Sequence, residues 1–260
     1  MVNPFILLPL YIYPSPGAWN TLFNSVTANP TVHFQVIVNP ASGPGTTPYP
    51  DSNYVSNVAQ LNSYTNVATL GYVHTSYGTR SQAQVKADIL TYQGWSGYAG
   101  ADIHMDGIFF DESPSSASLV PYMQSVSTYA KTTMTKGNIT VFNAGVNVDT
   151  GYFQYTDYVN VFENTYAAWT ASGSGVNSIP TTYRAKSTIM IHDYTASTTQ
   201  LNTDVTNVVN SGIAGQLFTT QSDYNLWSTQ WSNYVADLAP FRTSKIKIKR
   251  MSRFFRELMV

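Results

Sequence analysis

The feature that most constrains the fold is an alternation of short apolar runs with longer amphipathic stretches. The short runs are rich in Val, Ile, Phe and Tyr and are bounded by Pro, Gly, Asn and Ser, as β-strands are. Strands that alternate with helices pair side by side in parallel. The predicted strands are 5–13, 33–38, 67–73, 107–111, 139–143, 158–162, 187–192 and 214–219.

The stretches between the predicted strands favour helices, except for 165–183, which is rich in Ser, Gly and Thr and is expected to be a loop. The predicted helices are 17–27, 51–62, 80–94, 116–135, 199–211 and 225–239. A chain of 260 residues fits one large domain, and eight strands are what a closed barrel needs. We therefore expect an α/β fold, a single (β/α)8 TIM barrel over 1–240.

An open doubly wound sheet is the competing architecture. Such sheets usually carry a Gly-rich phosphate turn after the first strand, and here that turn is Pro14-Ser-Pro-Gly17. The start of the chain is interpreted as the first strand and not as a signal sequence. No Lys or Arg precedes its apolar run, and no small-residue cleavage site follows it.

Charge separates the chain into two parts. Residues 1–240 hold six Lys and Arg against 13 Asp and Glu, whereas 241–260 hold seven of the 13 basic residues. We expect 241–260 to be a basic C-terminal tail of unclear role: an appended helix, a disordered end or a contact to nucleic acid or membrane. Because the body is acidic, we expect no nucleic-acid partner, and no apolar run is long enough to span a membrane.

Glutamate is scarce, and its placement points to the chemistry. The chain has only Glu112, Glu163 and Glu257. The first two directly follow predicted strands, and barrel chemistry sits at the carboxyl ends of the strands. By strand parity, Glu112 shares a side with Ile108 and Phe110.

The same parity argument places Glu163 on the side of Val159 and Val161, and gives Asp111 the opposite side from Glu112. The twist at a strand end can still turn Asp111 into the mouth of the barrel. Two carboxylates that flank one bond are what glycoside hydrolysis requires. The candidate catalytic residues are therefore Glu112 and Glu163, unless these acids cap helices or pair with Arg184 or Arg80.

Other polar or aromatic residues at the predicted strand ends are candidates for substrate binding. The chain has 19 Tyr and five Trp, whose rings suit stacking against sugars, although most of them are expected to fill the core. The candidates are Tyr11, Tyr13, Asn39, Tyr72, His74, Asn143, His192 and Asp193.

Several other chemistries are disfavoured. The chain has no Cys, which excludes disulfides, thiolate nucleophiles and Cys metal sites. No Lys ends a predicted strand, so a Schiff-base mechanism is not expected. The four His lack metal-ligand spacing, and no G-x-S-x-G motif is present. We expect no cofactor and no metal.

Several segments together resemble the spherulin-4 family, which is glycoside hydrolase family 135. The most specific is Asp106-Gly-Ile-Phe-Phe-Asp-Glu112, and the resemblance covers about 1–240. The other segments are Pro9-Leu-Tyr-Ile-Tyr-Pro14, Gly17-Ala-Trp19, Val38-Asn-Pro-Ala-Ser-Gly43, Gly71-Tyr-Val-His-Thr75 and Tyr77-Gly-Thr-Arg80.

The resemblance implies a (β/α)8 barrel that cleaves internal bonds of galactosaminogalactan at N-acetylgalactosamine-rich stretches. It adds Asp111 to the catalytic candidates, as nucleophile or base. It gives Glu163 as general acid/base and Glu112 as an orienting or alternate acid. We expect a monomer that is extracellular or cell-wall associated, although no signal peptide is visible. A non-catalytic carbohydrate-binding or wall-associated barrel is the alternative.

Overall fold

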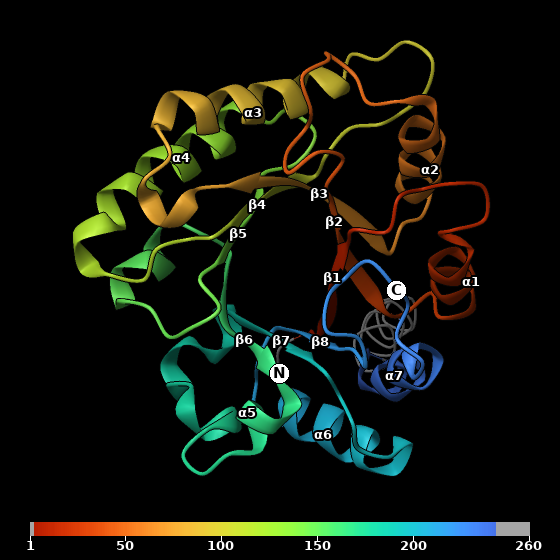
Figure 1. Cartoon of the computed structure of the whole chain (residues 1–260), viewed down its shortest axis with the longest axis vertical. Helices are drawn as coiled ribbons and strands as arrows, with labels where there is room; N and C mark the ends of the chain where they lie inside the picture. The colour runs from red at the N-terminus through yellow and green to blue at the C-terminus, as the bar shows by residue number, and fades with distance from the viewer. Residues whose placement is uncertain (1–2, 243–260) are drawn as a thin grey trace, which may run out of the picture.

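The computed structural model describes residues 3–242 and contains a closed barrel of parallel strands in the order β1 to β8. Figure 1 looks down this barrel, with the helices on the outside. The (β/α)8 fold predicted from the sequence is confirmed. The strands are β1 (Phe5–Leu10), β2 (His33–Val38), β3 (Val67–His74), β4 (Gly107–Asp111), β5 (Ile139–Asn143), β6 (Tyr158–Thr165), β7 (Ser187–His192) and β8 (Gly215–Phe218).

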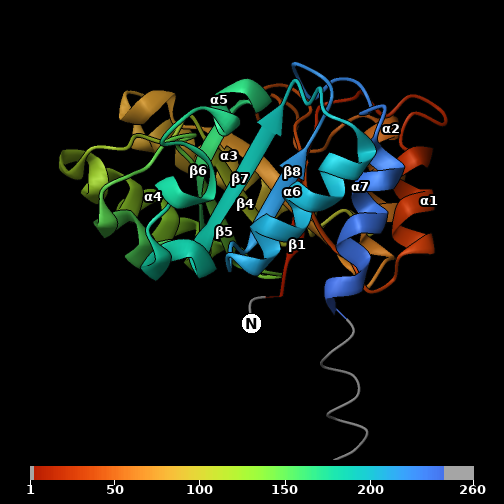
Figure 2. The same cartoon turned by 90° about the horizontal axis from the view of Figure 1, so that it is seen from below.

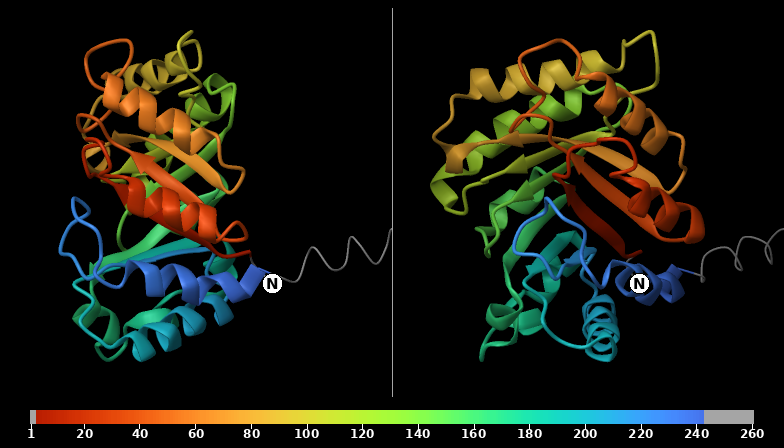
Figure 3. Two further views of the ribbon diagram at one scale, coloured as in Figure 1. Left: turned by 90° about the vertical axis from the view of Figure 1, so that its right-hand side faces the viewer. Right: turned by 45° about the vertical axis from the view of Figure 1, so that its right-hand side comes forward.

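The helices form the outer layer around the sheet, as the two views of Figure 3 show. They are α1 (Asn20–Ala28), α2 (Ser52–Asn62), α3 (Gln82–Trp95), α4 (Val120–Thr133), α5 (Tyr166–Thr170), α6 (Thr198–Asn210) and α7 (Trp231–Leu238). Short 3-10 segments η1 to η6 occupy Ser76–Gly78, Ala117–Leu119, Thr150–Gln154, Gly175–Ser178, Thr181–Lys186 and Ala239–Arg242.

Two sequence predictions about elements are corrected. The first strand ends at Leu10 and not at residue 13, because Tyr11 bonds through its backbone N–H to Tyr224 O and not to a neighbouring strand (3.2 Å). The segment 165–183 is not only loop, since it contains α5 and two 3-10 segments. The division at residue 240 stays a prediction, and 243–260 of the predicted tail lie outside the described residues.

Local sequence signals set where helices begin. Asp51 accepts backbone N–H bonds from Asn53 and Tyr54 at the start of α2, and Ser197 accepts one at the start of α6. Ser81 forms a capping box with Gln84 at the start of α3. Each cap ends the loop that follows a strand and begins the helix that runs back along the outside of the barrel.

The sheet and the helices share one apolar core. Gly71 in β3 lets α3 pack directly on the sheet, because a Cβ there would lie 2.7 Å from the Tyr92 ring. Gly71 therefore faces outward, and its neighbour Tyr72 faces the barrel interior. In Figure 2 the β7 and β6 arrows point away from the N-terminus, so the loops after the strands gather at the opposite end of the barrel.

Candidate active site

Two acids from alternate strands meet at the carboxyl end of the barrel. Asp111 ends β4, Glu163 lies in β6, and Asn143 ends the strand between them. The Asn143 Nδ2 donates to Asp111 Oδ1 and to Glu163 Oε2, each at 2.7 Å. Because one nitrogen makes both bonds, the two accepting oxygens lie within about 5.4 Å of each other.

A tyrosine holds the second oxygen of each acid. The Tyr72 hydroxyl, from β3, donates to Asp111 Oδ2 at 2.7 Å. The Tyr224 hydroxyl, from the loop between β8 and α7, donates to Glu163 Oε1 at 2.7 Å. All four carboxylate oxygens therefore accept a hydrogen bond, and both side chains have a fixed orientation.

A polar chain in the barrel interior supports the Asn143 amide. Asn160 Nδ2 donates to Asn143 Oδ1 at 2.8 Å, and Thr188 Oγ1 donates to Asn160 Oδ1 at 3.2 Å. Both Asn160 and Thr188 are fully buried. Since the carboxylates need donors, Asn143 must turn its nitrogen toward them, and this orientation fixes that of Asn160.

The structure corrects the parity argument for β4. His74 pairs with Asp111 and Tyr72 pairs with Phe109, so Asp111 faces the interior together with Tyr72. Glu112 follows the strand with φ +49°, a conformation that L-residues rarely adopt. Its side chain lies at the rim, 40% exposed.

The parity argument for β6 is also corrected. A bulge lies between Asn160, which pairs with Thr188, and Phe162, which pairs with Ile189. The extra residue reverses the alternation, so Glu163 shares its side with Asn160 and not with Val159. The bulge is what brings Asn160 and Glu163 to the same side of this strand.

The environment raises the pKa of Glu163. Burial is the largest cause, whereas the hydrogen bonds from Tyr224 and Asn143 oppose it, and the Asp111 charge adds to the increase. Burial and the neighbouring carboxylates also raise the pKa of Tyr72 and of Tyr224 well above the usual range. Both phenols therefore stay protonated and act as donors.

Two histidine–carboxylate contacts occupy the rim. His74 Nδ1 lies 3.0 Å from Ser76 Oγ and 3.7 Å from Glu112 Oε2. His192 Nδ1 lies 2.7 Å from Asp193 Oδ2, and Asp193 has φ +50°. His192 also contributes to lowering the pKa of Glu163, against the larger effect of burial.

Two predicted substrate-binding residues are not brought to the acids. The Tyr13 hydroxyl donates to Asp51 at 3.2 Å, beside the start of α2. Asn39 Oδ1 accepts the Gly43 N–H at 3.0 Å and so builds its own loop. The expected salt-bridge alternative is not seen among residues 3–242. There Arg80 bonds Asp88, and Arg184 bonds carbonyls at Val176 and Ile179.

Sequence reasoning missed two residues of the site. Tyr224 lies six positions beyond β8 in an irregular loop, and no local pattern marks it. Asn160 could have been found, because a lone Asn inside the apolar run Tyr158–Phe162 signals a polar partner inside the barrel.

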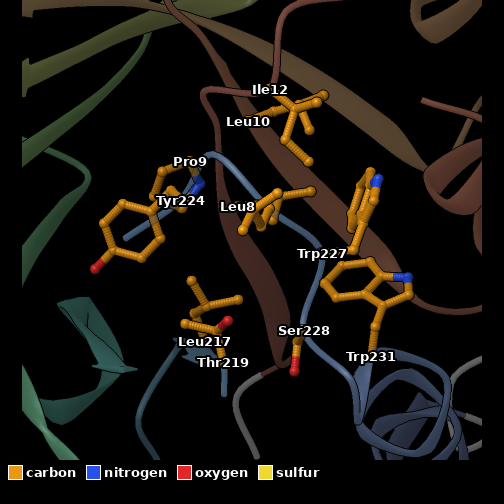
Figure 4. A pocket seen from close by; sticks show the side chains of 11 residues that line it. Leu8, Pro9, Leu10, Ile12, Leu217, Thr219, Tyr224, Trp227, Ser228 and Trp231 are labelled. Carbon is orange, nitrogen blue, oxygen red and sulfur yellow. The ribbon is translucent and has the colours of Figure 1, made fainter. Parts of the chain in front are cut away.

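An apolar pocket lies on the other side of the loop that carries Tyr224. Its lining includes Leu8, Leu10, Trp227 and Trp231. Figure 4 shows the Tyr224 hydroxyl pointing away from these side chains. The Trp227 indole donates to Ala18 O at 2.9 Å. These contacts seat the loop and so help to hold Tyr224 against Glu163.

The described residues contain no group of three or more His, Asp or Glu side chains that could hold a metal ion. Across 3–242 no helix is both long and apolar enough to cross a membrane.

The chain is similar in sequence to known proteins over most of its length. The model of the spherulation-specific family 4 matches residues 5–238. Spherulin-4 of Physarum polycephalum is 37% identical over 171 residues, which is 63% of this chain and 48% of that protein. This chain thus spans about half the length of that relative.

Solved structures agree with the family match. Aspergillus clavatus Sph3, crystallised in complex with GalNAc, is 34% identical, with a TM-score of 0.85 over 92% of this chain and 98% of that chain. A chitinase from Bacteroides thetaiotaomicron is 9% identical, with a TM-score of 0.59 over 93% of this chain and 97% of that one. The chitinase likeness concerns the fold alone.

Proposed function

The chain belongs to the spherulation-specific family 4, and from that membership we propose that it is a glycoside hydrolase that cleaves internal bonds of an amino-sugar polysaccharide. The observation that carries the proposal is the pair Asp111 and Glu163, held by one Asn143 nitrogen. Two carboxylates at this range can act on one glycosidic bond.

The short separation supports a retaining mechanism. Retaining enzymes place their carboxyl groups roughly 5–5.5 Å apart, whereas inverting enzymes need about 6.5–9.5 Å to admit a water. Here the bridged oxygens lie within about 5.4 Å, which is shorter than the separation that inverting enzymes need.

We assign Glu163 as general acid/base because burial raises its pKa, which favours the protonated form that a general acid needs. Asp111 then attacks the anomeric carbon and forms a glycosyl–enzyme ester as the glycosidic bond breaks. In the second half, Glu163 takes a proton from water, the water attacks the same carbon, and Asp111 leaves as a carboxylate. Glu112 at the rim orients the sugar.

The substrate assignment rests on the family. The Sph3 crystal contains GalNAc, so we propose an N-acetylgalactosamine-containing polymer, of the galactosaminogalactan type, as substrate. His74, His192 and Asp193 lie at the rim, where they could bind sugar hydroxyls. A polymer of a fungal matrix lies outside the cell, so we propose an extracellular or wall-associated location. We also propose that the chain is a monomer.

The test is release of oligosaccharides from galactosaminogalactan by the wild-type chain and by Asp111→Asn and Glu163→Gln. NMR of the first-formed product reports the anomer. We expect release by the wild type, with retained configuration, and a loss of at least about 10³-fold in each variant. Full activity in both variants would exclude this site. Sugar binding without any cleavage would instead indicate a carbohydrate-binding barrel.

A further inference from the structure

Tyr11 is an aromatic residue beside both acids whose hydroxyl the site leaves unused. Among residues 3–242, this hydroxyl has no hydrogen-bond partner, whereas Tyr72 and Tyr224 each donate to a carboxylate. The hydroxyl is also not one of the fully enclosed polar atoms that lack a partner. Tyr11 is only partly buried, so its hydroxyl is open to a ligand.

Ring contacts place Tyr11 between the other two tyrosines. Its ring packs edge to face against Tyr72, with centroids 5.7 Å apart, and against Tyr224, with centroids 5.8 Å apart. Tyr11 follows β1, which lies across the closed barrel from β5 and its Asn143. Asn143 thus bonds both acids on one side of the site. On the other side, the Tyr11 ring packs against the two tyrosines that bond those acids.

The hydroxyl of Tyr11 is a neutral donor in this place. Burial, and then the charges of Asp111 and Glu163, raise its pKa well above the ordinary value, so its proton is retained. Both oxygens of Asp111 and of Glu163 already accept a bond from another residue. The proton of Tyr11 is therefore available to a molecule that enters between the acids.

We propose that Tyr11 contacts the substrate, and that its hydroxyl donates a hydrogen bond to an acceptor oxygen of the sugar unit held between Asp111 and Glu163. The acceptor is a sugar hydroxyl or an acetamide carbonyl, which offer the same chemistry to a phenol. This inference rests on the proposed function and assigns Tyr11 a different task from that of Tyr72 and Tyr224, which position the acids.

Three matched variants test this division of tasks: Tyr11→Phe, Tyr72→Phe and Tyr224→Phe. Each removes one hydroxyl and keeps the ring. We expect Tyr11→Phe to lower kcat/KM on the polymer by about tenfold and to weaken N-acetylgalactosamine binding, measured by NMR titration, by a similar factor. The pH profile of kcat/KM should keep the wild-type midpoints, because Tyr11 bonds neither acid.

Tyr224→Phe gives the contrasting result, since it should move the pH midpoint assigned to Glu163. Tyr129→Phe, on the outer helix α4, is the control for loss of a tyrosine hydroxyl elsewhere and should behave as wild type. Binding and kcat/KM of Tyr11→Phe within twofold of wild type would overturn the inference while the proposed function stands. A shifted midpoint in Tyr11→Phe would also overturn it, because the residue would then act through an acid.

A wild-type chain that neither binds the monosaccharide nor cleaves the polymer would overturn the proposed function, and the inference with it. A wild type that binds but does not cleave, with binding lost in Tyr11→Phe, would overturn the hydrolase assignment and support the contact. Comparing N-acetylgalactosamine with galactose in the same titration identifies the acceptor. An equal effect of Tyr11→Phe on both sugars assigns a hydroxyl, and an effect on the former alone assigns the acetamide.

Discussion

The inner acids, Asp111 and Glu163, and the rim acids, Glu112 and Asp193, lie at the same mouth of the barrel but differ in backbone conformation and in bonding. Asp111 and Glu163 lie in strands, face the interior and have all four oxygens bonded. Glu112 and Asp193 follow strand ends with φ near +50° and contact histidines at the surface. The left-handed backbone at Glu112 thus directs two carboxylates that are adjacent in sequence, Asp111 and Glu112, to the interior and to the rim.

The largest expected effect is the difference in kcat between isosteric substitutions of the inner acids and of the rim acid Glu112. Asp111→Asn and Glu163→Gln should each lower kcat by about 10³-fold or more, because a positioned acid or nucleophile is lost. Glu112→Gln should lower kcat by less than about tenfold, since the Glu112 side chain is 40% exposed and lies 3.7 Å from His74 Nδ1. Steady-state kinetics on the polymer measure all three.

This prediction would fail in a specific way if the rim acid were the catalytic one. In that case Glu112→Gln would be as inactive as Glu163→Gln, and Asp111→Asn would keep most of its activity. Circular dichroism and thermal melting of each variant show whether a loss of activity reflects a loss of fold.

The next largest effect is expected at Asn143, whose side-chain nitrogen bridges the two inner acids. Asn143→Ala removes a donor from both inner acids and leaves the Asn160 amide without its acceptor. We expect a loss of about 10²-fold in kcat, because the two acids would lose their common orientation. The pKa of Glu163 should rise further, since the Asn143 bond lowers it.

The matched control for the bridge is His74→Ala at the rim, where the expected loss is about threefold. An Asn143→Ala enzyme with near wild-type kcat would show that the acids orient themselves without the bridge. The measurement is the pH dependence of kcat for both variants.

A smaller effect separates the two inner acids from each other. The Tyr224 bond lowers the pKa of Glu163 against the larger effect of burial. In Tyr224→Phe the pKa of Glu163 should therefore rise, and the alkaline limb of kcat/KM, where the acid loses its proton, should move to higher pH. The rate at the optimum should fall by about tenfold.

Tyr72→Phe is the comparison for this shift. It removes a donor from Asp111 and not from Glu163, so the alkaline limb should stay at its wild-type position. A shift of the same limb of the pH profile in both Tyr72→Phe and Tyr224→Phe would contradict the separate assignments of the two acids.

The sequence was sufficient for the fold and for the neighbourhood of the site. Alternating apolar runs predicted the closed barrel, and the scarcity of glutamate indicated Glu163. The strand-parity argument was wrong at the carboxyl ends of β4 and β6, for two different physical reasons. In β6 a bulge reverses the alternation before Glu163, and after β4 a left-handed residue turns Glu112 to the rim.

The remaining error came from contacts that are distant in the chain. Tyr224 reaches Glu163 across 61 positions from an irregular loop, and loop conformation has no periodicity to read. Tyr13 and Asn39 follow strands, as site residues do, but the Tyr13 hydroxyl donates to Asp51 at the start of α2, and Asn39 Oδ1 accepts a bond within its own loop. Position at a strand end therefore predicts proximity to the barrel mouth and not contact with Asp111 or Glu163.

The smallest expected effect is at Tyr13, and it tests that distinction between proximity and contact. The Tyr13 hydroxyl donates to Asp51, whose other oxygen already caps α2 through Asn53 and Tyr54. Tyr13→Phe should therefore leave kcat/KM within about twofold, while Tyr11→Phe, two positions earlier, should not. The free energy of unfolding should fall by less than about 0.5 kcal/mol, because an exposed hydroxyl finds water instead. Denaturant melts and polymer kinetics on both variants measure this difference, and a tenfold loss in Tyr13→Phe would place the substrate against the β1–α1 loop.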